Sequence, residues 1–277
     1  MRLAVSNIAW DVSEDEKIAA LLCRNSIDAI DIAPGKYFPI PVAALDEDIA
    51  RVKEWWAERG IEITGMQALL FGTTGLNLFG SVEARERMLA HLAAVCRIGA
   101  GLGATRLVFG SPKNRDRVGL DHQQAMEIAV PFFRQLGHIA CAAGVTICLE
   151  PNPACYGANF MIDSVETSEV VRQVAHPAIR MQLDSGALTI NGEDPSVILS
   201  DCADLIGHIH ASEPDLLPLG DGSTGHELMA LAINQYLPAR IVTIEMVATK
   251  DEPHDDSIER AIKVAKFHYR TKPEVGI

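Results

Sequence analysis

The sequence lacks the features that mark several protein classes. It has six cysteines in 277 residues and no Cys-X-X-Cys pair, which is typical of a reduced intracellular chain and not of a disulfide scaffold. No stretch approaches the roughly 20 apolar residues that a membrane helix needs. The apolar run at the N-terminus is too short for a signal peptide. We therefore expect a cytoplasmic protein that does not enter a membrane.

The sequence also has fewer basic than acidic residues. Lys and Arg total 24 against 37 Asp and Glu, which gives a formal net charge of −13 at pH 7. This excess of negative charge favours solubility and argues against polyanionic partners such as nucleic acid. With 48% hydrophobic and 22% charged residues, the composition is otherwise that of a globular protein with ample chain to bury a core.

No linker, low-complexity tract or charge block divides the chain. Instead, short apolar runs rich in β-branched residues alternate with longer segments in which apolar residues recur every three or four positions. The predicted strands are residues 2–8, 29–32, 61–66, 106–109, 145–149, 179–183, 205–210 and 240–246. The predicted helices are residues 14–24, 42–59, 82–99, 121–143, 164–174, 195–204, 226–236 and 257–269.

Strands that alternate with helices indicate βαβ units and a parallel sheet. Eight repeats of about 30 residues match the size of a closed (β/α)₈ barrel. A doubly wound sheet is the alternative, but it should carry a glycine fingerprint between an early strand and its helix. The only candidate, GAGLGA at residues 99–104, follows a predicted helix and precedes a strand. We predict an α/β protein, a single (β/α)₈ TIM barrel over residues 1–277.

Four predicted strands in the second half of the chain each end in a side chain that can bind a metal. They are Glu150, Asp184, His210 and Glu245. Their separations of 34, 26 and 35 residues are each close to one βα unit, so in a barrel they lie at the carboxyl ends of strands five to eight, where active sites are built. In these strands, the residues that point to the same side as the four candidate ligands include polar ones such as Gln182 and Thr243. The residues that point to the other side are aliphatic. His208 is expected one layer below His210, where it would orient a ligand.

Three carboxylates and one imidazole around a single point repel one another unless a divalent cation neutralises them. An oxygen-rich set with one nitrogen suits Mn²⁺ best, with Mg²⁺, Co²⁺ and Zn²⁺ as alternatives. Each residue alone could be an ordinary polar residue at a strand end. Four in register on consecutive strands favour a site for one divalent metal ion.

The quartet, with LEPN at residues 149–152 and LDSG at residues 183–186, resembles the xylose isomerase-like barrels. This superfamily includes sugar isomerases, ketose 3-epimerases, inosose dehydratases and repair enzymes of the endonuclease IV type. The segments GMQALLFG at residues 65–72 and GSPKNR at residues 110–115 resemble members classed as sugar phosphate isomerases or epimerases. The resemblance implies that Glu150 and Glu245 bind the metal and also form the catalytic acid/base pair, while Asp184 and His210 complete the coordination.

The chain also departs from these relatives. Ketose 3-epimerases carry a histidine where this chain has Ala187, a glutamate where it has Tyr156, and an arginine after strand seven that has no match here. These differences argue against carrying over the 3-epimerase specificity. The endonucleases use extra histidines for three metal ions, and Gln67 and Ala187 stand where two of them are expected, so we do not expect a trinuclear site.

Substrate binding has its own candidates, which are Asn7, Gln67, Lys113, Arg115, Glu213 and His226. Asn7 and Gln67 follow strands one and three and could form pocket walls. Lys113 and Arg115 follow strand four and could bind a phosphate or carboxylate, or simply be solvated. The other two border the loop GDGSTG at residues 220–225. That loop either binds phosphate or is a turn leading into a capping box formed by Thr224 and Glu227.

The sequence therefore predicts a metal-dependent isomerase or epimerase of a sugar, sugar phosphate or polyol. The metal would polarise a carbonyl, and one glutamate would remove the adjacent proton to give an enediolate. An inosose-type dehydratase on the same scaffold is the main alternative. A DNA repair enzyme is disfavoured by the net charge, and a non-catalytic sugar-binding barrel leaves the quartet unexplained. We expect a small sugar-derived substrate as partner; the sequence leaves the oligomeric state open, a homo-oligomer included.

Overall fold

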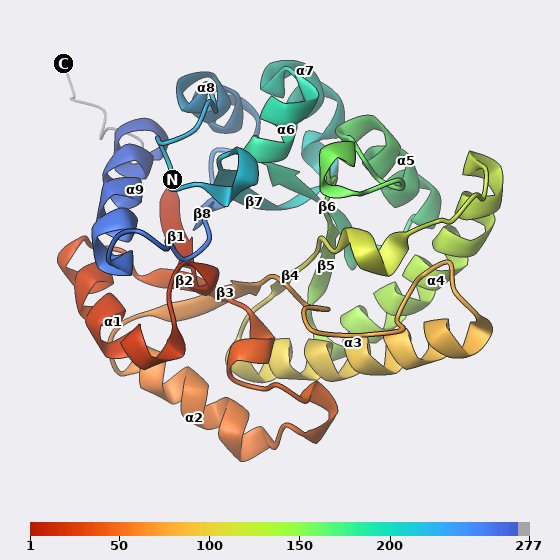
Figure 1. Ribbon diagram of the computed structural model, residues 1–277, viewed down its shortest axis with the longest axis horizontal. Helices are drawn as coiled ribbons and strands as arrows, with labels where there is room; N and C mark the ends of the chain where they lie inside the picture. The colour runs from red at the N-terminus through yellow and green to blue at the C-terminus, as the bar shows by residue number, and fades with distance from the viewer. Residues whose placement is uncertain (271–277) are drawn as a thin grey trace.

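Eight parallel strands close into a barrel in the computed structural model, which describes residues 1–270 (Figure 1). The strands follow one another around the barrel in chain order, as β1 (Arg2–Ser6), β2 (Ala29–Ile32), β3 (Glu62–Met66), β4 (Arg106–Phe109), β5 (Thr146–Leu149), β6 (Ile179–Asp184), β7 (Ile206–Ser212) and β8 (Ile241–Glu245). Closure comes from β1 and β8, which pair in parallel from Arg2 with Ile241 to Val5 with Ile244. The predicted (β/α)₈ barrel is confirmed.

Helices surround the strands as an outer ring (Figure 1). They are α1 (Asp15–Arg24), α2 (Asp46–Ala57), α3 (Val82–Leu102), α4 (His122–Ala143), α5 (Ser164–Val174), α6 (Ser185–Asn191), α7 (Pro195–Cys202), α8 (His226–Tyr236) and α9 (His254–Tyr269). Within the described part of the chain, none of them combines the length and apolarity that crossing a membrane requires.

The helices differ from the sequence-based prediction at several boundaries and by one additional helix. Helix α3 ends at Leu102 and not at residue 99, and α9 begins at His254 and not at residue 257. The predicted helix at residues 42–59 begins only at Asp46, because Pro41–Ala43 form a separate 3₁₀ turn. Helix α6 was not predicted. It is seven residues long and starts directly after β6, so it is too short to show a helical repeat of apolar residues.

Two layers of buried side chains fill the structure. Aliphatic and aromatic residues pack between the strands and the helices; for example, Phe109 of β4 meets Phe133 of α4 edge-to-face with ring centroids 5.4 Å apart. The barrel interior is more polar. Asp31 of β2 contacts His208 of β7, and because β2 and β7 are not neighbours in the sheet, this contact crosses the interior. The fold thus places polar groups inside the barrel, below the carboxyl ends of the strands.

Candidate active site

The carboxyl ends of four consecutive strands bring the predicted quartet together. Glu150, Asp184, His210 and Glu245 each offer a ligand atom, and these atoms all lie within 4.8 Å of one another. The Nδ1 atom of His210 is 3.0 Å from Oε2 of Glu245 and 3.7 Å from Oε1 of Glu150. Strand register sets Asp184 directly beside His210. One cation at this point could reach all four side chains.

Negative charge is crowded here. Burial, reinforced by the carboxylates of Glu150 and Glu245, raises the pKa of Asp184 to about 7. Burial alone would lower the pKa of His210, but the same two glutamates raise it well above its ordinary value. Both pKa shifts indicate that a positive charge placed within the cluster stabilises it electrostatically. A divalent cation supplies that charge and would displace the protons.

Asp184 is oriented by the start of α6 and by β7. Its Oδ1 accepts a hydrogen bond from the backbone N–H of Ala187 (2.7 Å), which makes Asp184 the N-cap of α6. Its Oδ2 accepts from the hydroxyl of Ser212 (2.8 Å), and that hydroxyl in turn accepts from the N–H of Gly186 (2.9 Å). The unpredicted short helix is therefore part of the candidate site, because its first turn fixes the carboxylate of Asp184.

Glu150 is held by a buried chain of polar contacts. Asn152, the last residue of the LEPN segment, donates from Nδ2 to Oε2 of Glu150 (3.2 Å) and accepts from Nη2 of Arg115 (2.6 Å). Arg115 is fully buried, and burial lowers its pKa to about 10. It therefore keeps its charge at neutral pH and contacts Glu150 through Asn152, whose role the sequence analysis missed although the segment was recognised.

A buried carboxylate, that of Asp31, lies below His210. Oδ2 of Asp31 lies 3.9 Å from Nε2 of His210, 2.6 Å from Nε2 of His208 and 2.8 Å from the hydroxyl of Thr243. Burial opposes ionisation, but the two imidazoles hold the pKa of Asp31 below its usual value. At 3.9 Å no hydrogen bond joins Asp31 to His210, and Nε2 of His210 has no hydrogen-bond partner among the described residues, so Asp31 acts on this ring through its charge. His208 lies one layer below His210, as predicted, but it contacts Asp31.

A cavity of about 540 Å³ opens above the quartet, a volume typical of sites for small molecules. Glu150, Asp184 and Glu245 line it, together with walls from the loops after β3, β4, β5 and β7. Phe71 stands on the rim with 86% of its surface exposed. Among the described residues, no Lys, Arg or His side chain lines this cavity.

Two of the six predicted substrate residues line the cavity. Gln67 is buried; its Nε2 donates to the hydroxyl of Ser6, and its Oε1 is buried without a hydrogen-bond partner. Glu213 also lines the cavity, but its carboxylate is occupied from behind by three donors. These are the N–H groups of Gly220 and Thr224 (both 2.8 Å) and Nε2 of His226 (2.9 Å). They overcome the effect of burial and lower the pKa of Glu213 to about 2.

The other four candidates are not among the lining residues. Asn7 is buried and accepts from the N–H of Ala33 through Oδ1 (2.7 Å). Lys113 is exposed, and Arg115 is buried behind Asn152. His226 lies between Glu213 and the hydroxyl of Tyr269, 2.7 Å from Nδ1. Their predicted contact with substrate stays a prediction.

The loop at residues 220–225 folds around Glu213. The backbone N–H groups that could have bound a phosphate donate to this carboxylate instead. The capping box predicted for Thr224 and Glu227 is not formed, because the N-cap of α8 is Gly225 and no side chain caps the helix. The hydroxyl of Thr224 instead donates to the carbonyl of Ser212 (3.0 Å), which ties the loop to β7.

Comparison with known proteins gives one family and several structural neighbours. Residues 22–267 match the family model described as "xylose isomerase-like TIM barrel". D-psicose 3-epimerase from Clostridium cellulolyticum H10, solved with D-tagatose, is 17% identical; the match covers 98% of this chain and all of that one, with a TM-score of 0.82. The 3-keto-D-glucoside 4-epimerase from E. coli is 16% identical over 95% and 99% of the chains, with a TM-score of 0.76.

The IOLI protein, solved with a zinc atom, is 16% identical over 97% of this chain and 98% of that one, with a TM-score of 0.77. At such identities the likeness establishes the fold. No curated protein matches the sequence.

Proposed function

Because this chain belongs to the xylose isomerase-like TIM barrel family, we propose that it is a divalent-metal-dependent enzyme that isomerises or epimerises a sugar. The observation that carries the proposal is the convergence of Glu150, Asp184, His210 and Glu245 at the base of a cavity of about 540 Å³. Structural neighbours that act on free or keto sugars support the same class of substrate.

The four side chains fit a divalent cation. Three carboxylates and one imidazole form an oxygen-rich donor set, which suits Mn²⁺, Mg²⁺ or Co²⁺ and also permits Zn²⁺. The raised pKa of Asp184 supports a site that favours added positive charge, and the negative charge of Asp31 lies 3.9 Å behind the imidazole of His210. A cation bound there would supply Lewis-acid polarisation of a substrate carbonyl and so acidify the neighbouring C–H bond.

Glu150 and Glu245 are the proposed acid/base pair. They lie at the ends of β5 and β8, which are separated in the barrel by β6 and β7, so their carboxylates approach a bound sugar from different sides. One carboxylate takes the proton from the carbon next to the carbonyl, and the C–H electron pair becomes the double bond of an enediolate. Return of a proton to the opposite face of the same carbon gives an epimer. Return to the former carbonyl carbon gives an isomer.

The charge of the cavity favours an unphosphorylated substrate. Its lining includes the acidic residues Glu150, Asp184, Glu213, Asp215 and Glu245. The two basic residues that sequence analysis offered for a phosphate do not line it: Lys113 is exposed, and Arg115 is buried behind Asn152. A phosphate dianion would meet several carboxylates without a basic partner, which is unfavourable even beside one divalent cation. We propose an uncharged ketose or polyol-derived ketone as substrate.

The test is a proton-exchange screen. The protein, loaded with Mn²⁺, is incubated in deuterated water with ketoses, inososes and the corresponding sugar phosphates, and deuterium incorporation next to the carbonyl is followed by NMR. We expect exchange with an uncharged ketone and loss of exchange after treatment with a chelator. Exchange confined to phosphorylated compounds would contradict the uncharged substrate. Exchange accompanied by loss of water would identify a dehydratase, and no exchange with any compound would overturn the proposed function.

A further inference from the structure

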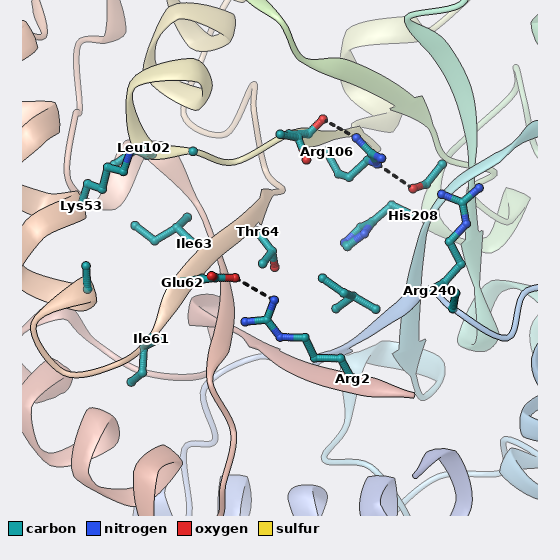
Figure 2. A pocket seen from close by; sticks show the side chains of 16 residues that line it. Arg2, Lys53, Ile61, Glu62, Ile63, Thr64, Leu102, Arg106, His208 and Arg240 are labelled. Atoms are coloured by element: carbon teal, nitrogen blue, oxygen red, sulfur yellow. Dashed lines mark hydrogen bonds and ion pairs between the residues drawn. The ribbon is translucent and has the colours of Figure 1, made fainter. Parts of the chain in front are cut away.

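A second cavity, of about 550 Å³, lies at the opposite end of the barrel, where the strands begin (Figure 2). Arg2 and Arg106 are the first residues of β1 and β4, and Arg240 immediately precedes β8. Lys53 of α2 completes the set of basic residues in the lining. We propose that this cavity binds a small molecule that carries a phosphate group, at a site separate from the proposed active site.

The cavity concentrates positive charge in an acidic protein. Four basic residues line it against a single carboxylate, Glu62. Glu62 is already paired with Nη1 of Arg2 (2.7 Å), and Nε of Arg2 pairs with Asp28 (2.9 Å). The remaining three basic residues have no carboxylate partner among the described residues. In a chain with a net charge of −13, the gathering of these cations around one cavity favours a small anion.

Lys53, Arg240 and Arg106 all keep hydrogen-bond donors that could bind an anion. Lys53 and Arg240 make no side-chain hydrogen bond or ion pair with any described residue, so their full donor capacity is free. Arg106 donates from Nε to the carbonyl of Gly207 (3.1 Å) and from Nη1 to that of Thr105 (3.2 Å). These two carbonyls fix the guanidinium without neutralising it, and Nη2 stays unused. A preorganised, charged donor is what a phosphate oxygen binds best.

The basic groups of the cavity come from separate elements. Arg106 starts β4, but its guanidinium is bound to the carbonyl of Gly207 in β7, the strand next to β8. Its charge therefore lies on the same side of the cavity as Arg240, and Figure 2 shows both beside His208. The floor is polar. Thr64 and His208 line it, and each is held by the buried Asp31: the Thr64 hydroxyl donates to Oδ1 (3.0 Å), and Nε2 of His208 is 2.6 Å from Oδ2.

A purely structural role for these arginines would be to close the end of the barrel with their aliphatic stems. That role leaves unexplained a cavity as large as the one above the quartet, with four basic residues and a single carboxylate in its lining. The volume fits a small molecule, whereas the overall negative charge repels a long polyanion. A phosphate monoester of a small metabolite satisfies both conditions.

Calorimetric titration of the full-length protein tests the proposal. The probes are inorganic phosphate and ribose 5-phosphate, with ribose as the uncharged control. A chelator is present so that no metal at the opposite end can bind phosphate. We expect both phosphates to bind, and R240Q and K53Q each to weaken binding by about tenfold, the scale of one hydrogen bond to a charged group. The matched control K263Q removes an exposed charge on α9 and should leave binding unchanged.

The side chains of Lys53 and Arg240 have no described partner, so R240Q and K53Q leave no group unpaired and both variants should fold. Circular dichroism verifies this. Binding of equal strength in R240Q, K53Q and the parent protein would overturn the proposal. So would the absence of binding at millimolar phosphate, or binding of ribose as strong as that of ribose 5-phosphate. The test needs no turnover, so its result is independent of the proposed sugar chemistry.

Discussion

Oε2 of Glu150 occupies the space that a side chain at Gly110 would need: a Cβ atom built on Gly110 would lie 1.8 Å from that oxygen. Gly110 follows β4 directly, and Glu150 follows the neighbouring β5. The absence of a side chain at one strand end is thus what lets the carboxylate of the next strand enter the quartet.

Replacing Gly110 with alanine should therefore displace Glu150 and weaken metal binding. A carbon–oxygen approach of 1.8 Å is far inside contact distance, so the carboxylate must move. We expect a loss of about tenfold or more in Mn²⁺ affinity, the scale of disturbing the support of a ligand, measured by calorimetry. The control is G35A, where an added Cβ meets no atom within 4 Å. Unchanged affinity in G110A would mean that Glu150 is not a ligand.

The second prediction concerns catalysis. Replacing Glu245 with glutamine keeps the shape of the side chain but removes the basic carboxylate. Turnover should fall by about 10²-fold or more, the scale of general acid–base catalysis, while the other three ligands retain metal at reduced affinity. Rates of solvent deuterium exchange and elemental analysis on the same sample provide the measurement. The exposed residue Glu227 supplies the control, E227Q. A metal-loaded E245Q protein with the parent rate would remove Glu245 from the mechanism.

The third prediction is the metal content, which should be one tightly held divalent ion per chain. Gln67 and Ala187 line the cavity, and neither offers an imidazole that could bind a further metal ion. Elemental analysis of protein purified without chelator checks the number. Two or more equivalents of zinc per chain, together with cleavage of DNA at abasic sites, would contradict both the single metal ion and the proposed sugar substrate.

The fourth prediction is a dependence of stability on pH that comes from Glu213. Its pKa is lowered from 4.5 to about 2 in the folded protein. The unfolded chain therefore binds more protons between these values, and the stability that Glu213 contributes is complete above pH 4.5 and is lost as the pH falls toward 2. Replacing Glu213 with glutamine should lower the free energy of unfolding at pH 7 by about 1–3 kcal/mol, because buried donors lose a charged acceptor.

Urea denaturation at pH 7 and at pH 3 measures this effect. The difference between the parent protein and E213Q should narrow at the lower pH, whereas E227Q, which changes an exposed glutamate, should match the parent at both. A difference that stays constant with pH would show that the hydrogen bonds to Glu213 do not depend on its charge.

The barrel and the quartet could be predicted because each depends on local sequence. A strand covered by helices must be apolar on its outer side, and a helix that covers it must repeat its apolar residues every three or four positions. Eight such strand–helix repeats predict a closed (β/α)₈ barrel. The quartet could be recognised for a related reason: parallel strands of a closed barrel all end at one face, so four ligand-type residues at strand ends must converge once the strands are correctly assigned.

Only the tertiary structure decided what each remaining polar side chain contacts. Asp31 lies in an apolar strand 177 residues before His208, and nothing near it in the chain indicates that it meets two histidines across the barrel interior. Arg115 and Glu213 have the residue types of substrate ligands, yet the first contacts Asn152 and the second is held by the loop that follows it. Sequence spacing fixes which end of the barrel a residue occupies, but the direction of its side chain depends on partners that come from distant elements.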